Sequence, residues 1–298
     1  MFTSVKERKA MEVNLSIDAA TCIKCGKCAD VCPSKIIRQK EKQSDLMLVD
    51  VHLCISCGHC VSVCPTNSVC HSAFPTEKVH PFNYEGYPSE EQMMLLCKAR
   101  RSNRAFSKKR VPNQLIDKIV EASHSAPSAS NSRKIAYTII NDPEKLRLIT
   151  EFTLSTFNSI KKKLEFPLLK PLAKLFLPDA YRYVPLFESL YDAYYKEGED
   201  LILRNATGVI LYHTPGYYRF GSIDSNLAYQ NGSLMAECLG VNQFYLGFVY
   251  TATQLNKGKL EKLLQIDGTI HAGMAIGLPK FRFLNYVDRE EIKVTTFD

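Results

Sequence analysis

The feature that most constrains this 298-residue chain is a cysteine pattern that occurs twice near its start. The first run, CIKCGKCADVCP, covers residues 22–33, and the second, CISCGHCVSVCP, covers residues 54–65. Every cysteine, one glycine and the final proline recur at an offset of 32 residues (54 − 22 = 32). An internal repeat of this kind predicts two copies of one small structural unit.

The placement of the cysteines favours metal binding over disulfides. Eight of the eleven cysteines precede residue 65, whereas Cys70, Cys97 and Cys238 are isolated. The total is odd, and the charged N-terminus lacks the apolar core of a signal peptide, so a secreted disulfide scaffold does not fit. A zinc ribbon needs only paired C-x-x-C knuckles and leaves the third cysteine and the C-P step unexplained. We therefore expect metal-binding cysteines in a cytoplasmic protein.

Both runs have the spacing C-x-x-C-x-x-C-x-x-x-C-P, which resembles the pattern of bacterial two-cluster ferredoxins. The resemblance implies that residues 1–80 form a small electron-carrying domain with two [4Fe–4S] clusters. It also implies that the last cysteine of each run binds the cluster of the other run. The ligands would be Cys22, Cys25, Cys28 and Cys64 for one cluster, and Cys54, Cys57, Cys60 and Cys32 for the other.

A stretch with prolines and a glycine separates this domain from the rest of the chain. It has little periodicity, and we place the linker at residues 81–88. Ser89 and Gln92 then have the spacing of a capping box, which predicts the start of a helix. We expect this helix to bury Met93, Leu96, Cys97 and Ala99.

Beyond residue 89 the hydrophobic pattern predicts helices and strands in irregular alternation. The expected fold class is α+β, with a small ferredoxin-like two-cluster domain followed, over residues 89–298, by a mixed sheet covered by helices. Helices are expected from Pro112 and over residues 226–239. Strands are expected over residues 135–140, 208–212, 244–246 and 272–276.

Three motifs in the second domain carry a further resemblance. R-R-S-x-R-x-F occupies residues 100–106, A-P-S-x-x-N occupies residues 126–131, and G-x-P occupies residues 277–279, ahead of more basic residues. In this order they resemble the nitroreductase family of FMN enzymes, and the resemblance covers roughly residues 88–298. Proteins that fuse a ferredoxin domain to a nitroreductase domain are a known subgroup of this family. The resemblance implies a nitroreductase-like fold and an intertwined homodimer with FMN across the subunit interface.

The chemistry of these motifs suits FMN, which carries a phosphate dianion and a ring whose N1–O2 edge becomes negative on reduction. Arg100 and Ser102 can donate hydrogen bonds to the phosphate, and by resemblance Arg104 reaches the pyrimidine edge. The resemblance also places Leu246 and Gly247 near flavin N5 and assigns the loop after residue 126 to the partner subunit. The complete expected FMN set is Arg100, Arg101, Ser102, Arg104, Pro127, Ser128, Ala129, Asn131, Arg133, Leu246, Gly247, Lys280 and Arg282.

Simpler interpretations stay open for these residues. A basic helix end can merely complement the helix macrodipole in solvent, and the small-residue loop fits an ordinary helix-to-strand turn. The chain also departs from the family, which commonly has Gln, Pro and an aromatic residue where Arg133, Lys134 and Ile135 stand. Arg133 either adds positive charge near the flavin or is a solvated surface residue.

Residues 152–195 are rich in Leu, Phe and Tyr and are interrupted by four prolines. In relatives the corresponding region covers the flavin, so we expect a lid or a dimer arm. The alternative is an amphipathic segment on a membrane surface, and the prolines argue against one long interfacial helix. We therefore expect no membrane partner.

Charge and composition limit the classes of ligand. The formal net charge of +7 counts every cysteine as neutral, so anionic clusters and a flavin phosphate would reduce it. No compact Lys/Arg tract is present, and we expect no nucleic-acid partner. No G-x-G motif occurs, which argues against a Rossmann dinucleotide site.

Taken together, these features predict an FMN- and iron–sulfur-dependent oxidoreductase in which two clusters relay electrons to or from FMN. The electron donor would be an external ferredoxin or NAD(P)H, and the acceptor a nitroaromatic, a quinone or an activated alkene. No catalytic side chain is expected, because the cofactor performs the chemistry. The alternatives are a non-enzymatic electron carrier and another flavin reaction on the same fold, such as reductive dehalogenation.

Overall fold

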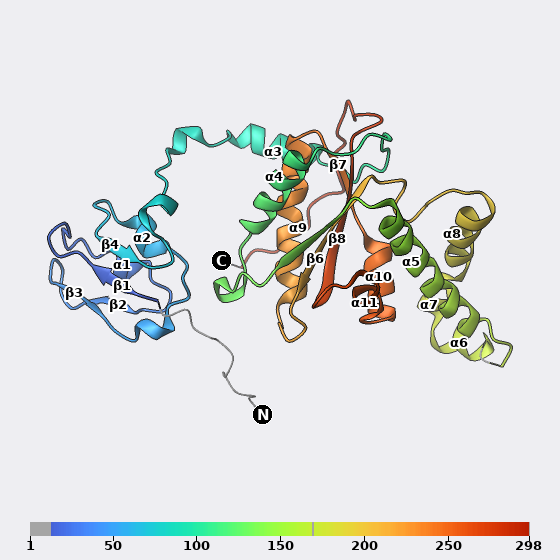
Figure 1. The fold of residues 1–298 in the computed structure, drawn as a ribbon, viewed down its shortest axis with the longest axis horizontal. Coiled ribbons are helices and arrows are strands. Elements are labelled where there is room, and N and C mark those ends of the chain that lie inside the picture. Colours follow the sequence, from blue (N-terminus) through green and yellow to red (C-terminus); the bar gives the residue numbers. More distant parts are fainter. Residues whose placement is uncertain (1–12, 169, 298) are drawn as a thin grey trace. The chain divides into compact units, whose positions relative to one another are not determined.

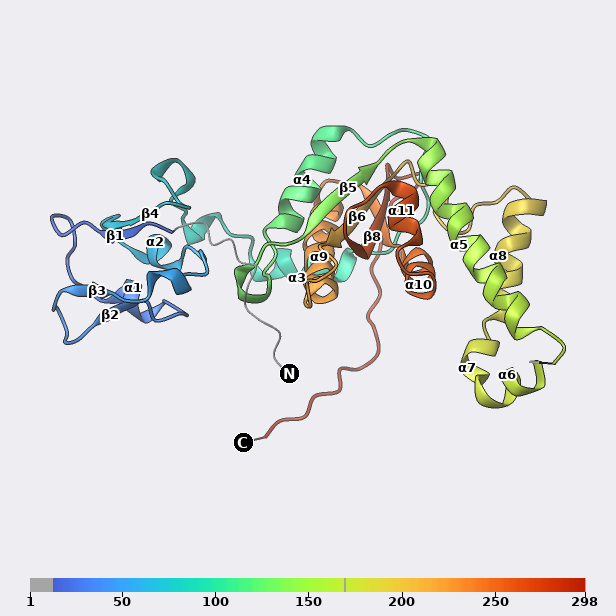
Figure 2. The ribbon, with the colours of Figure 1, turned by 60° about the horizontal axis from the view of Figure 1, so that its bottom comes forward.

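The computed structural model describes residues 13–168 and 170–297. The chain divides into two compact units, one ending at Tyr87 and also including Ser130–Ser132, and the other comprising the remaining residues from Pro88 onward. Figures 1 and 2 show the helices and strands of each unit.

The first unit is ferredoxin-like and consists of two small antiparallel sheets with two short helices. β1 pairs with β4, placing Leu15 opposite His71, and β2 pairs with β3, placing Ile37 opposite Leu48. Buried apolar side chains from both sheets and both helices form one core. The bounds are β1 (Leu15–Ile17), α1 (Lys27–Asp30), β2 (Ile37–Gln39), β3 (Leu46–Leu48), α2 (His59–Val63) and β4 (Val69–His71).

The two cysteine runs also share their backbone conformation. Gly26 and Gly58, with φ of 78° and 77°, directly precede α1 and α2. This left-handed conformation is accessible to glycine without steric cost. Lys24 and Ser56, two residues earlier, also have positive φ, at 54° and 50°. The sequence repeat is therefore a structural repeat as well.

A four-stranded sheet in the order β5-β6-β8-β7 forms the centre of the second unit. All three strand pairs are antiparallel. β8, the last strand of the sheet along the chain, lies between β6 and β7, so those two strands run parallel to each other without being neighbours. The bounds are β5 (Ala136–Ile140), β6 (Gly208–Thr214), β7 (Asn242–Tyr245) and β8 (Thr269–Gly277).

Helices cover both faces of this sheet (Figure 1). Every residue of β6 is buried, as expected of a strand covered on both sides. Ile210 and Tyr212 belong to the core shared with α4 and α9, whereas Val209 and Leu211 belong to the core shared with α5, α8, α10 and α11. The bounds are α4 (Asn113–His124), α5 (Pro143–Leu164), α6 (Lys170–Phe176), α7 (Pro178–Tyr181), α8 (Val184–Lys196), α9 (Gly221–Cys238), α10 (Gly247–Leu255) and α11 (Lys259–Leu264).

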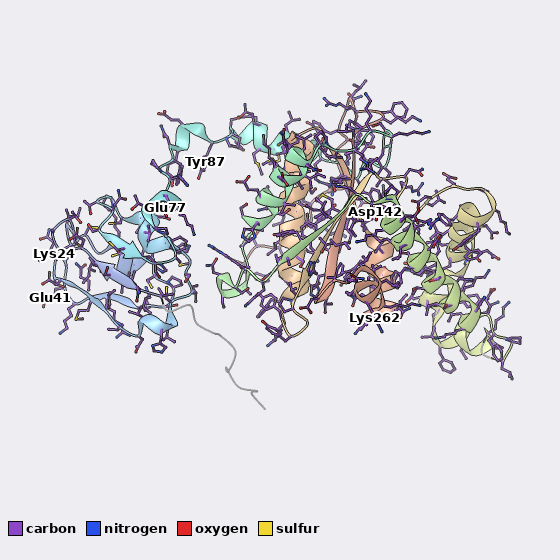
Figure 3. All side chains as sticks on the ribbon, viewed as in Figure 1. Lys24, Glu41, Glu77, Tyr87, Asp142 and Lys262 are labelled. Atoms are coloured by element: carbon purple, nitrogen blue, oxygen red, sulfur yellow. The ribbon has the colours of Figure 1, made fainter. Side chains whose placement is uncertain are left out.

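The segment expected to be a lid or arm is folded into α5–α8. Asp142, labelled in Figure 3, caps α5 by accepting the N–H of Glu144 at 3.0 Å. Pro178 and Pro185 stand in the first turns of α7 and α8, where a missing N–H costs nothing. The prolines thus begin separate helices. No helix among the described residues is long and apolar enough to cross a membrane.

The structure confirms the expected α+β class, with helices at the positions predicted from Pro112 and over residues 226–239. The latter helix, α9, begins earlier than expected, at Gly221. The sheet itself is antiparallel in every pair rather than mixed. The reason is that β8 inserts between the two strands that the β6–α9–β7 crossover leaves parallel.

The first helix of the second unit, α3 (Glu90–Ala99), has the expected capping box between Ser89 and Gln92. The expected burial of these four side chains is wrong, because Met93 and Cys97 are exposed and Leu96 and Ala99 are only partly buried. No residue of α3 is buried in the described chain. The capping box depends only on neighbouring residues, so the sequence predicted it correctly. Burial depends on a second surface against α3, which the described chain does not provide.

The contact between α9 and α4 yields a stability prediction. A Cβ added at Gly232 would meet Ser123 Oγ and would lie 3.0 Å from Tyr212 Oη. Those two hydroxyls are fully buried and 3.2 Å apart in a hydrogen bond, so neither can move freely. We expect Gly232→Ala to lower the free energy of unfolding by about 1–3 kcal/mol through overpacking, in spite of the higher helix propensity of alanine. Urea denaturation followed by circular dichroism measures this difference.

Gly216→Ala is the matched control in the same unit. Its Cβ would make an ordinary 3.6 Å contact with Thr269 Oγ1, so we expect a change within about 0.5 kcal/mol. A similar loss of stability in both variants would contradict the proposed packing at Gly232.

Candidate functional sites

The cysteines of the first unit line two cavities. Each cavity contains three cysteines from one run and the last cysteine of the other run, the grouping that cross-ligation requires. The first set is Cys22, Cys25, Cys28 and Cys64, and the second is Cys54, Cys57, Cys60 and Cys32.

Hydrogen-bond donors lie next to cysteine sulfurs in both cavities. The Sγ of Cys64 accepts the backbone N–H of Ser68 at 3.2 Å. The Sγ of Cys54 accepts the backbone N–H of Ser56 at 3.4 Å and lies 3.5 Å from Nε2 of His71. Such donors favour the thiolate, which is the form that binds metal.

Burial acts in the opposite direction on the cysteines themselves. It raises the pKa of Cys28 and raises that of Cys60 to about 11, so metal binding there has to displace protons. Among the described residues, no three His, Cys, Asp or Glu side chains converge closely enough to hold a single metal ion. The cysteines surround cavities instead, an arrangement that fits a cluster of several irons.

The candidate site of the second unit is organised by Asn103, which is buried in the middle of the motif at residues 100–106. Its backbone N–H donates to the carbonyl of Gln243 in β7 at 3.1 Å. Its side chain donates to the carbonyl of Phe281 at 3.2 Å and accepts the N–H of Ala105 at 3.0 Å. Asn103 therefore ties the motif both to β7 and to the chain that follows β8.

Further contacts hold these two segments together. The backbone N–H of Lys280 donates to the carbonyl of Ala105 at 2.9 Å. Burial raises the pKa of Glu237, and the nearby cations Arg100 and Arg282 partly oppose this shift. The structure thus gathers basic residues that the sequence predicted from opposite ends of the domain: Arg100, Arg101, Arg104, Lys280 and Arg282.

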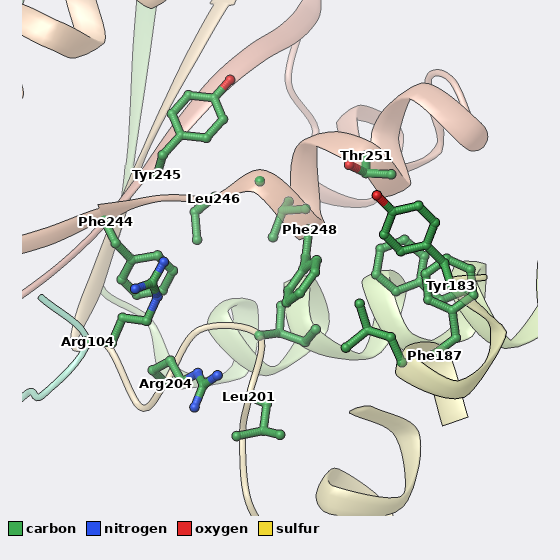
Figure 4. Close-up of a pocket in the computed structure, with 15 residues that line it drawn as sticks. Arg104, Tyr183, Phe187, Leu201, Arg204, Phe244, Tyr245, Leu246, Phe248 and Thr251 are labelled. Carbon is green, nitrogen blue, oxygen red and sulfur yellow. The ribbon is translucent and has the colours of Figure 1, made fainter. Parts of the chain in front are cut away.

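A pocket of about 530 Å³ shares Arg104 with this basic cluster (Figure 4). Most of its lining is aromatic or aliphatic. The guanidinium of Arg104 lies 5.2 Å from the ring centroid of Phe244 in a cation–π contact. Leu246 and Gly247 stand at the start of α10, where the first backbone N–H groups have no acceptor within the helix. The pocket can therefore offer both a cation and backbone donors to a flat, electron-rich ligand.

The small-residue loop after α4 is fixed by Asp224, a buried carboxylate in the first turn of α9. This carboxylate accepts the backbone N–H of Ala129 at 3.2 Å. Further along, Asn131 and Arg133 have positive φ, at 51° and 47°. Within the described chain, none of residues 127–133 lines the pocket. The loop and the pocket are thus two separate parts of the expected site.

Sequence reasoning missed Asn103, Asp224 and Arg204, the last of which lines the pocket. Asn103 occupies the unassigned position of R-R-S-x-R, and an asparagine flanked by polar residues gives no periodic signal of burial. Asp224 and Arg204 are far in sequence from the loop and the motif that they accompany, so only the fold brings them there.

Comparison with known proteins identifies both units. The Nitroreductase family model matches residues 97–278, and a 4Fe-4S dicluster domain matches residues 21–68. A nitroreductase with bound FMN from Bacteroides fragilis NCTC 9343 is 17% identical at a TM-score of 0.52, over 70% of this chain and 99% of that one. A BluB-like flavoprotein from Clostridium difficile 630 is 16% identical at a TM-score of 0.51, over 66% and 94%.

Two curated relatives match shorter stretches. Iodotyrosine deiodinase 1 of Sus scrofa is 31% identical over 77 residues, and that of Mus musculus is 27% identical over 105 residues. These matches cover 24% and 33% of this chain and only 27% and 34% of the relatives' own lengths. The family model, in contrast, matches more than half of the chain. The chain belongs to the nitroreductase family and carries a 4Fe-4S dicluster domain ahead of the family domain.

Proposed function

We propose that this protein is an FMN-dependent oxidoreductase in which two [4Fe–4S] clusters relay electrons to or from FMN. The observation that carries the proposal is the presence, in one chain, of two four-cysteine cavities and a cationic, largely apolar pocket in a nitroreductase-family domain. The Bacteroides fragilis neighbour holds FMN, which supports the same cofactor here.

The first unit would hold the clusters, which supply one-electron transfer when bound. Its own contribution is a pair of cysteine-lined cavities and the N–H groups that point at cysteine sulfurs, such as those of Ser56 and Ser68. The ligands would be Cys22, Cys25, Cys28 and Cys64 for one cluster, and Cys54, Cys57, Cys60 and Cys32 for the other.

The second unit would hold the flavin, which supplies two-electron chemistry when bound. Arg100, Lys280 and Arg282 would bind its phosphate, because the bonds through Asn103 and Ala105 hold their two segments together. Ser102 would add a hydroxyl donor. Charge-assisted hydrogen bonds from arginine suit a phosphate dianion.

The end of the pocket lined by Arg104, Phe244 and Leu246 would hold the flavin ring, and the end lined by Tyr183, Phe187 and Thr251 would stay open to a substrate. Arg104, steadied by the ring of Phe244, would present a cation to the edge that becomes negative on reduction. The N-terminal N–H groups of α10 after Leu246 would donate to the opposite, N5 side. The apolar walls would exclude water, so these charges act in a medium of low polarity.

We further infer a homodimer that completes this site. Three large apolar side chains of α3 are exposed, as are several that follow β8, and so large an apolar surface is typical of a subunit interface. The partner subunit would cover it and contribute its loop at residues 127–133. The exposed side chains concerned are Met93, Met94, Leu95, Phe281, Phe283, Leu284, Val287, Ile292, Val294 and Phe297.

The acceptor would be a small molecule such as a nitroaromatic, a quinone or an activated alkene, and the donor an external ferredoxin or NAD(P)H. Reductive dehalogenation is the second candidate, because segments of two iodotyrosine deiodinases match this chain at 31% and 27% identity. An electron carrier without enzymatic activity is the remaining alternative. The pocket argues against it, since a carrier has no need of a cavity beside its flavin.

Cofactor content tests the proposal directly. Wild-type protein purified without oxygen should contain about eight irons, eight sulfides and one FMN per chain. Cys32→Ala and Cys64→Ala should each lose about four irons, from different clusters, because each removes a ligand from the other run's cavity. Arg282→Ala should lose flavin and keep iron, since it removes a phosphate contact. Chemical assays of iron, sulfide and released flavin give these values.

Two exposed residues serve as controls for these variants. Cys70→Ala should retain all iron, because Cys70 lines neither cysteine cavity of the described chain. Lys262→Ala, on α11, should retain all flavin. Iron without flavin in the wild type would leave an electron carrier, and unchanged flavin in Arg282→Ala would reject the assigned phosphate site.

Asn103 yields a second prediction as a positioning residue. Asn103→Ala should lower the free energy of unfolding by about 1–3 kcal/mol, because it leaves the Phe281 carbonyl and the Ala105 N–H without their partner. It should also weaken FMN binding about tenfold, because residues 100–106 and the segment after β8 lose the hydrogen bond that connects them. Equilibrium dialysis measures the affinity. Asn83→Ala, which removes exposed bonds to Glu85, should leave FMN affinity unchanged; equal weakening in both variants would contradict the role of Asn103.

A further inference from the structure

The pocket wall contains a second arginine, Arg204, whose backbone is unusual. Arg204 and Asn205 both have φ of 56°, in the left-handed region that residues other than glycine seldom adopt. Such conformations persist where the surrounding structure holds them, often next to binding sites.

The chain on both sides of Arg204 is firmly held. The carboxylate of Asp200 accepts the backbone N–H groups of Ile202 and Leu203, each at 2.9 Å. Both of these side chains are buried in the core, and the N–H of Ala206 donates to the carbonyl of Leu203 at 3.0 Å. The left-handed turn at Arg204 therefore follows directly after a buried segment, and the side chain of Arg204 lines the pocket (Figure 4).

The charges of the pocket point to an anionic ligand. Of the fifteen described residues that line it, Arg104 and Arg204 alone are charged, and both are positive. Arg104 is engaged with Phe244 and with the carbonyl of Ser102. Arg204 has no hydrogen bond or ion pair in the described part of the chain. A guanidinium on an apolar wall is well suited to binding a carboxylate through two parallel hydrogen bonds.

We propose that Arg204 binds the carboxylate of an aromatic substrate, so that the pocket selects aromatic acids over their neutral analogues. The aromatic and aliphatic lining, with Phe187 and Phe248 among it, would hold the ring of such a substrate. This inference rests on the proposed function for turnover, although binding itself can be measured separately.

The test compares 4-nitrobenzoate with methyl 4-nitrobenzoate, reduced by the holoenzyme with dithionite as electron donor. In Arg204→Gln the ratio of the KM for the acid to the KM for the ester should rise at least about tenfold, the loss expected for a charge-assisted pair. Arg204→Asn, which tolerates the left-handed backbone, should raise the ratio similarly and excludes a purely conformational cause. An unchanged ratio, or loss of FMN in both variants, would overturn the proposal.

Binding separates this inference from the proposed function. Calorimetry of benzoate with the wild type and with Arg204→Gln requires no turnover. Weaker benzoate binding in the variant supports the role of Arg204 even if no nitro compound is reduced. Equal benzoate binding rejects that role even if nitro reduction is observed.

A separate observation concerns His71, which makes the two cysteine cavities different. His71 is buried in β4 and lines the cavity that contains Cys54. Its Nδ1 accepts the backbone N–H of Ala73 at 3.0 Å, so in the neutral ring the proton is on Nε2. Nε2 lies 3.5 Å from Cys54 Sγ. The backbone contact thus fixes the tautomer that donates to sulfur.

Among the described residues, the equivalent position of the first repeat makes no bond to a cysteine sulfur, although in the cavity that contains Cys22 the hydroxyl of Thr66 lies 3.7 Å from Cys64 Sγ. The residue 32 positions before His71 is Gln39 (71 − 32 = 39). Its side-chain amide donates to the carbonyls of Lys24 and Ser44, at 2.9 Å and 2.7 Å. The same position therefore supports the backbone in one repeat and contacts a cysteine sulfur in the other.

We infer that the His71 N–H raises the reduction potential of the cluster held by Cys54. A hydrogen bond to a ligand sulfur stabilises the reduced, more negative cluster. This inference rests on the proposed clusters and not on the flavin.

Redox titration of the anaerobic protein, followed by electron paramagnetic resonance, tests this inference. His71→Leu should lower one of the two cluster potentials by about 59 mV, which corresponds to a tenfold change in the equilibrium constant of a one-electron reduction. His71→Gln, which can keep a donor near sulfur, should restore part of the shift. Gln39→Leu removes structural bonds from the first repeat and should reproduce no such shift. Two results in an iron-retaining His71→Leu protein would overturn the role of His71: an equal shift of both cluster potentials, or no shift of either. If His71→Leu loses iron, the potentials of His71→Gln and of the wild type are compared instead.

Discussion

The candidate flavin site depends on the position of β8 in the sheet. Because this strand pairs with both β6 and β7, the chain that leaves it passes next to β7 and the motif at residues 100–106. The bonds of Asn103 to Gln243 and Phe281 then fix the two segments to each other. Basic residues from the beginning and the end of the domain converge for this reason, and a phosphate dianion needs several such donors at once.

A comparable dependence links the two halves of the first unit. Each cysteine cavity takes its fourth cysteine from the other run, and β1 and β4 pair the two ends of the unit. Burial raises the pKa of the Cys60 thiol, so metal binding at this cysteine has to displace a proton. The clusters would thus stabilise the fold as well as carry electrons.

Positive charge and hydrogen-bond donors are placed next to the expected anionic cofactors in both units. The formal net charge is +7, whereas thiolate-bound clusters and a flavin phosphate would be anionic, and the clusters and the flavin ring would gain negative charge on reduction. Arg104 and Arg204 supply positive charge to the pocket lining, and N–H donors approach sulfur in the cysteine cavities. Both units therefore place positive charge or hydrogen-bond donors where electrons would arrive, which favours the reduced states.

The sequence alone determined what is local or repeated: the two cysteine runs, the capping box of α3, the α+β class and the family motifs, all of which depend on spacing along the chain. Only the tertiary structure decided the antiparallel order of the sheet, because strand order follows from where β8 inserts and not from any strand's own pattern. It alone showed α3 exposed, since burial is a property of neighbouring surfaces. Asn103, Asp224 and Arg204 likewise became visible only in the fold, because each acts on segments distant in sequence.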